Sequence, residues 1–157
     1  MSRRDQITQI AESTPFDNDS NGFTSDNVQD AIEEIGASAS PGFSFGRSGN
    51  VSSGTWLRRP GNVPSNRAGV TVPIANPTIV EISTSNRNID TYTIEIVQHE
   101  GNLVNLVSLG TVTVISARGG TFTVNFSTTK GQQIAVRLIG GGSVRDLGVD
   151  IVIRGNA

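Results

Sequence analysis

Apolar and polar residues alternate with a period of two through the later part of the chain. In residues 91–96, Tyr92, Ile94 and Ile96 fall on one face of an extended segment, and the residues between them are polar. The same alternation runs through residues 121–126, 133–138 and 149–154. Each of these segments is therefore predicted to be a half-buried β-strand.

Turn signals rich in Gly and Asn separate these segments from further candidate strands. The candidate strands lie near residues 69–72, 78–83, 103–108 and 111–115, and the turns at 85–88, 100–102, 118–120, 130–131 and 140–142. About eight short strands at a spacing of about 8 to 12 residues, with no helical pattern between them, favour an antiparallel β-sandwich or jelly roll over a parallel sheet. We expect this all-β head domain to occupy residues 67–157.

One segment, residues 23–36, has a helical pattern instead. Val28, Ala31, Ile32 and Ile35 have the i, i+3, i+4, i+7 spacing that places them on one side of a helix. A helix of about three turns is marginal in water by itself, so this stripe must pack on a partner surface. Copies of the same helix in a short coiled coil are the favoured partner, and packing on the chain's own β domain is the alternative.

Two polar segments flank the predicted helix. Residues 1–22 are rich in Asp, Asn and Ser around the isolated apolar residues Ile7, Ile10 and Phe16, which predicts an extended arm. Residues 37–66 are rich in Gly, Ser, Pro and Asn, which predicts a linker that leads into the head. The length of 157 residues fits one globular domain plus a tail.

Charge and composition argue against several classes of function. The formal net charge is −2, so no face that neutralises many phosphates is expected, and nucleic acid is a poor candidate partner. The chain has no cysteine, which removes disulfides and thiolate metal sites. Its apolar runs are far shorter than the ~20 residues that span a bilayer, and no secretion signal follows the basic N-terminus. We expect a protein made in the cytoplasm, with no membrane insertion.

The segment Asp17-Asn18-Asp19-Ser20-Asn21-Gly22 resembles the start of a calcium-binding loop, because it supplies the first oxygen ligands and the turning glycine. The twelfth position of such a loop should be a bidentate glutamate, and here it is Val28. No helix is predicted before the loop either. A solvated turn that leads into the helix is therefore favoured, and no metal or cofactor is predicted.

The single histidine, His99, lies at a predicted strand end beside a turn. A catalytic base needs a nucleophile or a metal partner, and the surrounding pattern supplies neither. A surface or hairpin histidine is favoured. Since no carboxylate pair, triad or metal cluster stands out elsewhere, we expect that the protein is not an enzyme.

Arginines offer one possible ligand site. Arg58 and Arg59, which precede Pro60, could form a small anion-binding patch with Arg67, because guanidinium groups bind carboxylates and phosphates through paired donors. Solvated loop charge or an intersubunit ion pair is the favoured interpretation. The run Gly140-Gly141-Gly142 precedes no helix N-terminus and is interpreted as a hairpin turn, not a phosphate loop.

Two segments resemble known phage proteins. The run from Phe16 to Ile35, with the core Asn27-Val28-Gln29-Asp30-Ala31-Ile32-Glu33, resembles a short module that recurs in tail-fibre and other fibre proteins of phages, usually before or between trimeric domains. Residues 54–69 and 92–101 resemble β domains of phage virion proteins. Asp19 and Asn21 depart from the module, whose turn is often rich in Ser or Thr.

The resemblance implies a virion structural protein, commonly a homotrimer, such as a fibre or decoration protein. Its arm would dock on a capsid, portal, adaptor or tail protein with Ile7, Ile10 and Phe16 as buried anchors, and the helix stripe would gather the copies. The alternative function is viral attachment, in which the head binds a host-surface glycan or protein. Trp56 and Tyr92 are the aromatic side chains on which a sugar ring could stack, but both are expected in the core, so structural attachment is favoured.

Overall fold

The computed structural model describes residues 27–28, 41–102 and 104–155. The chain divides into two compact units, residues 1–39 and residues 40–157, and the second unit contains every strand discussed below. The predicted arm, with Ile7, Ile10 and Phe16, lies outside the described residues, as does the turn at residues 17–22. Of the predicted helix only Asn27 and Val28 are described. Ala31, Ile32 and Ile35 also lie outside, so the arm and helix remain predictions.

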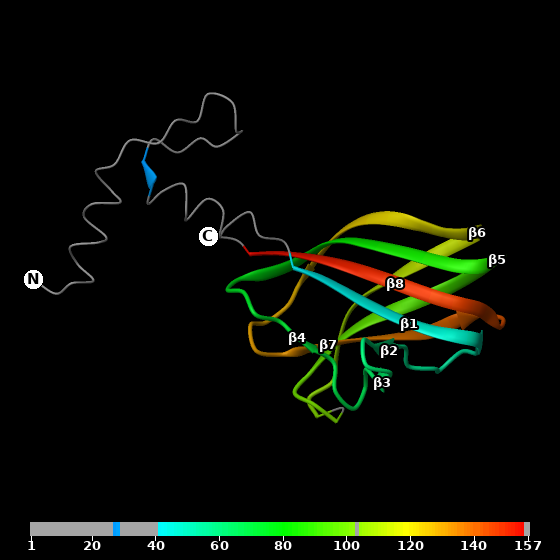
Figure 1. The fold of residues 1–157 in the computed structure, drawn as a ribbon, viewed down its shortest axis with the longest axis horizontal. Helices are drawn as coiled ribbons and strands as arrows, with labels where there is room; N and C mark the ends of the chain where they lie inside the picture. Colours follow the sequence, from blue (N-terminus) through cyan, green and yellow to red (C-terminus); the bar gives the residue numbers. More distant parts are fainter. Residues whose placement is uncertain (1–26, 29–40, 103, 156–157) are drawn as a thin grey trace, which may run out of the picture. The chain divides into compact units, whose positions relative to one another are not determined.

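The second unit is an antiparallel β fold, in agreement with the predicted fold class (Figure 1). Every strand pairing in it is antiparallel. Its strands are β1 (Gly42–Val51), β2 (Arg58–Arg59), β3 (Val63–Pro64), β4 (Val70–Thr71), β5 (Pro77–His99), β6 (Val107–Ser127), β7 (Gln133–Gly141) and β8 (Val144–Gly155).

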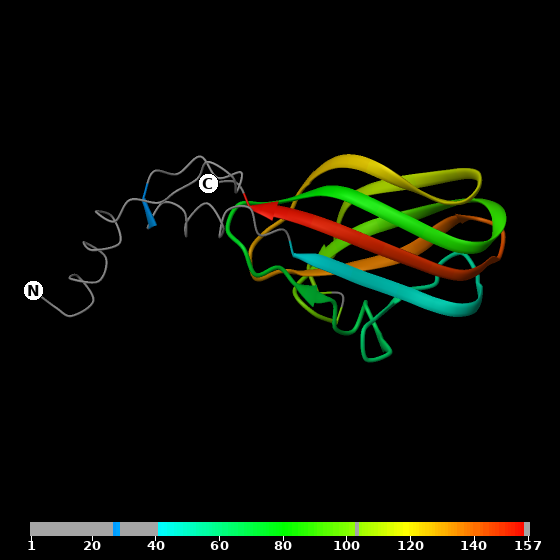
Figure 2. The same cartoon turned by 45° about the horizontal axis from the view of Figure 1, so that its top comes forward.

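Two long strands organise the sheet. β5 pairs with β6 along nearly its whole length, and on its other side it pairs first with β8, through Pro77–Ser85, and then with β7, through Tyr92–His99. The β5–β6 ribbon therefore passes from one part of the sheet to the other, and the sheet curls around a core between its layers (Figure 2). The strand order is β3-β2-β1-β8-β5-β7-β4, with β6 beside β5.

The ribbon bends where the sequence predicted two turns. Residues 85–88 and 118–120 were expected to separate strands, but they lie inside β5 and β6, opposite each other. The pairing register shifts between Ser85 and Asp90, and Gly119 adopts a φ of +123° on the partner strand. β5 runs antiparallel to β8 before these residues and antiparallel to β7 after them, and β7 and β8 run in opposite directions across the short connection between them. The predicted turns therefore do reverse the chain: the β5–β6 ribbon folds back here without a break in either strand (Figure 1).

The alternating apolar side chains of β5, β7 and β8 form much of the core. Tyr92, Ile94 and Ile96 are buried as predicted, and so are the alternating apolar residues of β7 and β8. The largest fully buried apolar side chains in the described part are Tyr92, Leu57, Ile79, Ile82, Ile94, Ile96, Ile134, Leu138, Leu147, Ile151 and Ile153. Burying each such aliphatic side chain contributes about 1.5–3 kcal/mol.

The predicted linker, residues 37–66, is mostly part of the head. β1 lies within it and pairs with β8, and Phe45, Val51 and Leu57 are buried. The prediction missed β1 because Gly and Ser occupy its exposed positions, so that its composition looks like that of a linker although its larger side chains point into the core. The head therefore begins near Ser40, not at residue 67.

A candidate anion-binding groove beside β1

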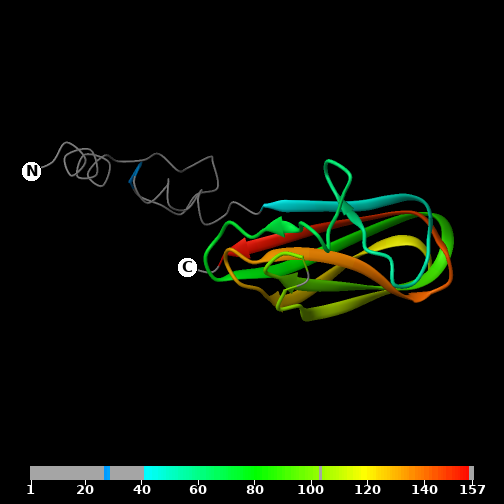
Figure 3. The ribbon, with the colours of Figure 1, turned by 90° about the horizontal axis from the view of Figure 1, so that it is seen from below.

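The β2–β3 hairpin lies beside β1, with which β2 pairs (Figure 3). The hairpin and β1 together line a groove. Arg58 of β2 lies opposite Gly46 of β1 and Pro64 of β3. The hairpin turn contains Gly61 at φ 87° and Asn62 at φ 63°, a left-handed conformation that glycine and asparagine tolerate best. This turn fixes the position of the two arginines that precede it.

The groove consists of two adjoining hollows. The first has a volume of about 370 Å³ and lies between residues 44–46 and residues 58–62. The second, of about 380 Å³, is lined by residues 46–48, Arg58 and Asn62. Gly46, Arg58 and Asn62 border both hollows, so the two lie side by side.

Three guanidinium groups line the groove, from Arg47, Arg58 and Arg59. Arg58 is held in place, since its Nη1 donates to Asn62 Oδ1 at 2.8 Å and to the Asn62 carbonyl oxygen at 3.2 Å. The Nε atom of Arg59 is buried and has no hydrogen-bond acceptor. Within the described part of the chain, none of the three arginines has an ion-pair partner.

No carboxylate lines either hollow. The nearest recorded link to one is Ser44, which borders the first hollow and donates from Oγ to Asp150 Oδ1 at 2.6 Å. Residues 41–157 carry ten Arg or Lys and six Asp or Glu, a formal net charge of +4, although the whole chain is at −2. The electrostatic character of the groove and of its unit therefore favours an anionic ligand.

The predicted arginine patch is assembled only in part. The structure brings Arg58 and Arg59 together, but Arg67 is exposed and lines neither hollow; its carbonyl oxygen accepts from the Asn102 N–H at 3.3 Å. Arg47 takes its place, because the β1–β2 pairing brings it close. The sequence gives no signal for Arg47, because the composition of residues 37–66 predicts a linker and a linker predicts no pairing of β1 with β2.

His99 lines neither hollow. It ends β5 beside the turn toward β6, as the hairpin alternative predicts, but its predicted surface position is wrong. Its side chain is fully buried, with 0% exposed. Its Nε2 lies 3.0 Å from the Ser65 carbonyl oxygen, and its Nδ1 accepts from the Gly101 N–H at 2.9 Å. Since Nδ1 accepts, the proton of the neutral ring belongs on Nε2, which donates to Ser65. His99 thus joins two loops.

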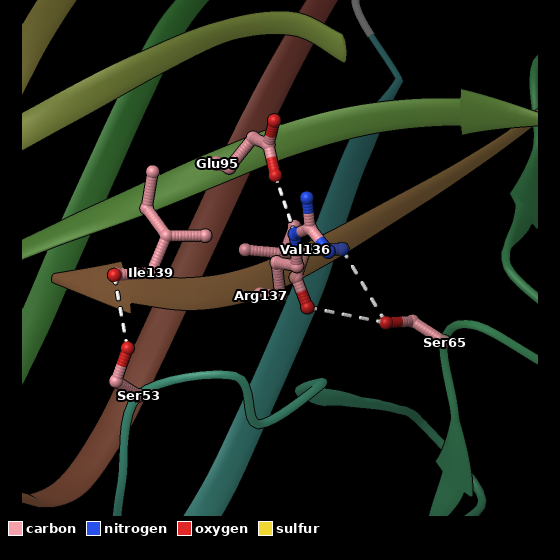
Figure 4. A network of polar contacts seen from close by, with 6 residues as sticks. All are labelled: Ser53, Ser65, Glu95, Val136, Arg137 and Ile139. Carbon is pink, nitrogen blue, oxygen red and sulfur yellow. Dashed lines mark hydrogen bonds and ion pairs between the residues drawn. The ribbon is translucent and has the colours of Figure 1, made fainter. Parts of the chain in front are cut away.

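The aromatic residues do not form an open sugar platform. Tyr92 is 1% exposed, as expected for the core, and its hydroxyl donates to Asn86 Oδ1 at 3.0 Å. Trp56 is half-buried, and the Arg137 guanidinium lies 5.1 Å from its ring centroid. Arg137 also pairs with the Glu95 carboxylate (Figure 4). The expected core position therefore holds fully for Tyr92 and partly for Trp56.

Glu95 is buried, with 8% of the residue exposed. Burial alone would raise its pKa, but hydrogen bonds from Arg137 and Ser108, together with the charge of Arg137, outweigh burial and lower the pKa below its usual value. Glu95 is therefore held as the anion that orients Arg137 over Trp56.

The remaining candidates carry no chemistry in the described residues. β7 ends at Gly141 and β8 begins at Val144, so Gly140-Gly141-Gly142 lies at a hairpin turn as predicted. Among the described residues, no group of three or more His, Asp or Glu side chains could hold a metal ion. No helix in this part of the chain is long and apolar enough to cross a membrane.

No family model matches the chain, and no curated protein sequence matches it. Among solved structures it is similar to the globular domain of zebrafish complement 1qA protein, with a TM-score of 0.45 and 10% identity over 74% of this chain and 98% of that chain. It is also similar to the N-terminal cellulose-binding domain of a Cellulomonas fimi β-1,4-glucanase, with a TM-score of 0.41 and 12% identity over 74% of this chain and 89% of that chain. At these scores neither likeness assigns a family or a ligand to this chain.

Proposed function

We propose that the protein is a non-enzymatic structural protein of a bacteriophage particle, a fibre or decoration protein that docks through its N-terminal arm and projects the β head. The observation that carries this proposal is the order of two features. The fibre-like module at residues 16–35 directly precedes a compact antiparallel β unit that begins at Ser40. Its location would be the virion.

Such a protein works by burying surface and by avidity. An arm that orders on binding a capsid, portal, adaptor or tail protein gains affinity from its apolar anchors, minus the cost of ordering. Gathering several copies raises the effective concentration of each arm at the particle surface. The predicted helix stripe of Val28, Ala31, Ile32 and Ile35 would provide this gathering, most simply in a homotrimer.

The head offers a second surface for assembly along β6. This strand pairs only with β5 among the described strands, so one of its edges has no strand partner there. Phe122, Val124 and Phe126 on its core-facing side are only half-buried, and Ile115 is 73% exposed. An open edge flanked by apolar side chains is a surface on which another copy can pack.

The solution mass of the full chain and of a truncation to residues 40–157 tests the proposal. The truncation contains the whole described hydrophobic core, so it is expected to fold by itself. A full-length trimer that becomes a monomer on truncation places assembly in the helix, and a trimer in both places it in the head. A full-length chain that is monomeric at every concentration would overturn self-assembly.

A matched pair of variants makes the test residue-specific. Ile32→Asp places a charge on the predicted helix stripe, whereas Gln29→Asp adds the same charge off the stripe. If the helix assembles the protein, Ile32→Asp dissociates it and Gln29→Asp does not. Equal masses for both variants would remove the helix from the assembly.

Viral attachment, in which the head binds a host-surface ligand, is the second candidate function. The groove favours it, because its three arginines have no ion-pair partner among the described residues. The buried Tyr92 and the covered Trp56 weigh against a stacking platform for neutral sugars. A ligand of this head would therefore be recognised by its charge.

A further inference from the structure

We propose that the groove between β1 and the β2–β3 hairpin is a binding site for an oxyanion, a carboxylate or phosphate group borne by a sugar-sized unit of a larger ligand. The site is formed by Arg47, Arg58 and Arg59, with Asn62 as a positioning residue. This proposal does not depend on the proposed virion function, because a titration measures ligand binding and the solution mass measures assembly.

Uncompensated positive charge is the first argument. Three arginines border the two adjoining hollows, Arg59 the first, Arg47 the second and Arg58 both, and no carboxylate lines either hollow. Like charges held close together repel one another, and a bound anion would remove this repulsion. Arginine also offers several N–H donors in a planar fork that matches the oxygens of carboxylates and phosphates.

The second argument is the unsatisfied Arg59. Its buried Nε has no acceptor, and no hydrogen bond or ion pair joins its side chain to another described residue. Leaving a buried donor unpaired costs about 1–3 kcal/mol, and more for a charged group, so such groups in a native protein need an explanation. A ligand oxygen in the adjoining hollow, met by a small rotation of the side chain, would supply the missing acceptor.

The third argument is preorganisation. Asn62 engages only Nη1 of Arg58, which leaves the other guanidinium donors available to a ligand. The left-handed turn at Gly61 and Asn62 keeps the amide in place. The two hollows, of about 370 and 380 Å³, are open to solvent, so a charged group of a ligand can reach the arginines from outside. The groove thus presents oriented donors to a charged sugar or a phosphate-bearing unit.

A titration of the full chain at low ionic strength tests the site. The readout is the ¹H–¹⁵N NMR signals of the arginine Nε–H groups and the backbone amides. The probes are sodium glucuronate, inorganic phosphate and neutral glucose. We expect glucuronate or phosphate to shift the signals of Arg58, Arg59 and residues 46–48 and 61–62, and glucose to leave them unchanged. Response to glucuronate alone identifies a sugar acid as the source, and response to phosphate alone identifies a phosphate-bearing ligand.

Variants separate a built site from general attraction to a positive surface. Arg58→Gln and Arg59→Gln should each weaken binding by about tenfold or more. Arg154→Gln removes the same charge from an exposed position at the other end of β8 and should change affinity by less than about twofold. Asn62→Gly removes the amide but keeps a residue that tolerates the left-handed turn, and should weaken binding with the fold intact. Equal losses in Arg154→Gln and Arg58→Gln, or no saturable shift with either anion, would overturn the proposal.

Discussion

Replacing the buried His99 should lower the free energy of unfolding of the head by several kcal/mol. Different replacements should separate the contributions of its two hydrogen bonds. The ring is fully buried and holds two backbone groups, the Ser65 carbonyl at 3.0 Å and the Gly101 N–H at 2.9 Å. His99→Ala leaves both groups unpaired, at about 1–3 kcal/mol for each buried group, and opens a cavity where the ring was. The Gly101 amide is less deeply buried and can recover water, so the expected total is about 3–5 kcal/mol.

Two amide variants separate the contributions of the two hydrogen bonds to this loss of stability. Glutamine can place an amide nitrogen near the position of Nε2 and keep the bond to Ser65, whereas asparagine can place an oxygen near Nδ1 and keep the bond from Gly101. We therefore expect His99→Gln and His99→Asn each to lose about 1–2 kcal/mol, less than His99→Ala. His99→Asn should lose more than His99→Gln, because the bond to Ser65 is the more buried of the two.

Urea denaturation of the 40–157 unit, followed by the fluorescence of the single Trp56, measures these differences. The slope of free energy against urea must stay constant across the variants for the comparison to hold. A loss below about 1 kcal/mol in His99→Ala would refute the assignment of His99 as a link between the two loops. Equal losses in all three variants would mean that the ring volume matters and its hydrogen bonds do not.

Two further predictions concern buried polar groups of β5. Tyr92→Phe should lower the free energy of unfolding by about 1–3 kcal/mol, because it leaves Asn86 Oδ1 without its hydrogen-bond donor. Urea denaturation measures this loss. An unchanged free energy of unfolding would mean that water replaces the hydroxyl. The lowered pKa of Glu95 predicts that its contribution to stability is fully present above pH 4.5, the ordinary value, and is lost as the pH falls through the lowered pKa. Glu95→Gln should flatten that part of the stability–pH curve, and an unchanged curve would contradict it.

The pattern of apolar residues predicts the sheet well wherever one face of a strand meets the core. In residues 92–96 of β5, 134–138 of β7 and 147–153 of β8 every second residue is apolar and buried, so the period identifies these segments as strands. It does not show where a strand ends. Asn, Arg and Gly at 85–88 and 118–120 reverse the direction of β5 and β6 without ending either strand, and the sequence alone does not distinguish such a reversal from a turn between two strands.

The site was predicted less well than the sheet because it depends on a segment that carries no periodic signal. Residues 53–72 run beside β7 and bond to its backbone: Leu57 N–H donates to the Val136 carbonyl at 2.9 Å, and Ser65 Oγ contacts Val136 N and O at 3.3 Å (Figure 4). None of these contacts follows from local sequence. Arg58 and Arg59 could be named as an anion-binding pair from their chemistry, but Arg47 could not be placed beside them without the β1–β2 pairing.

The errors over His99 and over the linker have one physical cause. Glu95, Val97 and His99 alternate with the core residues of β5, so by pattern they belong to the outward face. Val97 and His99 are nevertheless fully buried, and Val97 is not part of the main core cluster. The His99 bond to Ser65 indicates that residues 53–72 provide this cover.

The same segment carries the β2–β3 hairpin, which holds Arg58 and Arg59. Its hydrogen bonds to β7 and His99 fix it on one side, and its pairing with β1 fixes it on the other. The arginines of the groove therefore project from a segment attached at both sides. A rigid support of this kind lets like charges remain close together without rearranging, which is the condition for a preorganised anion site.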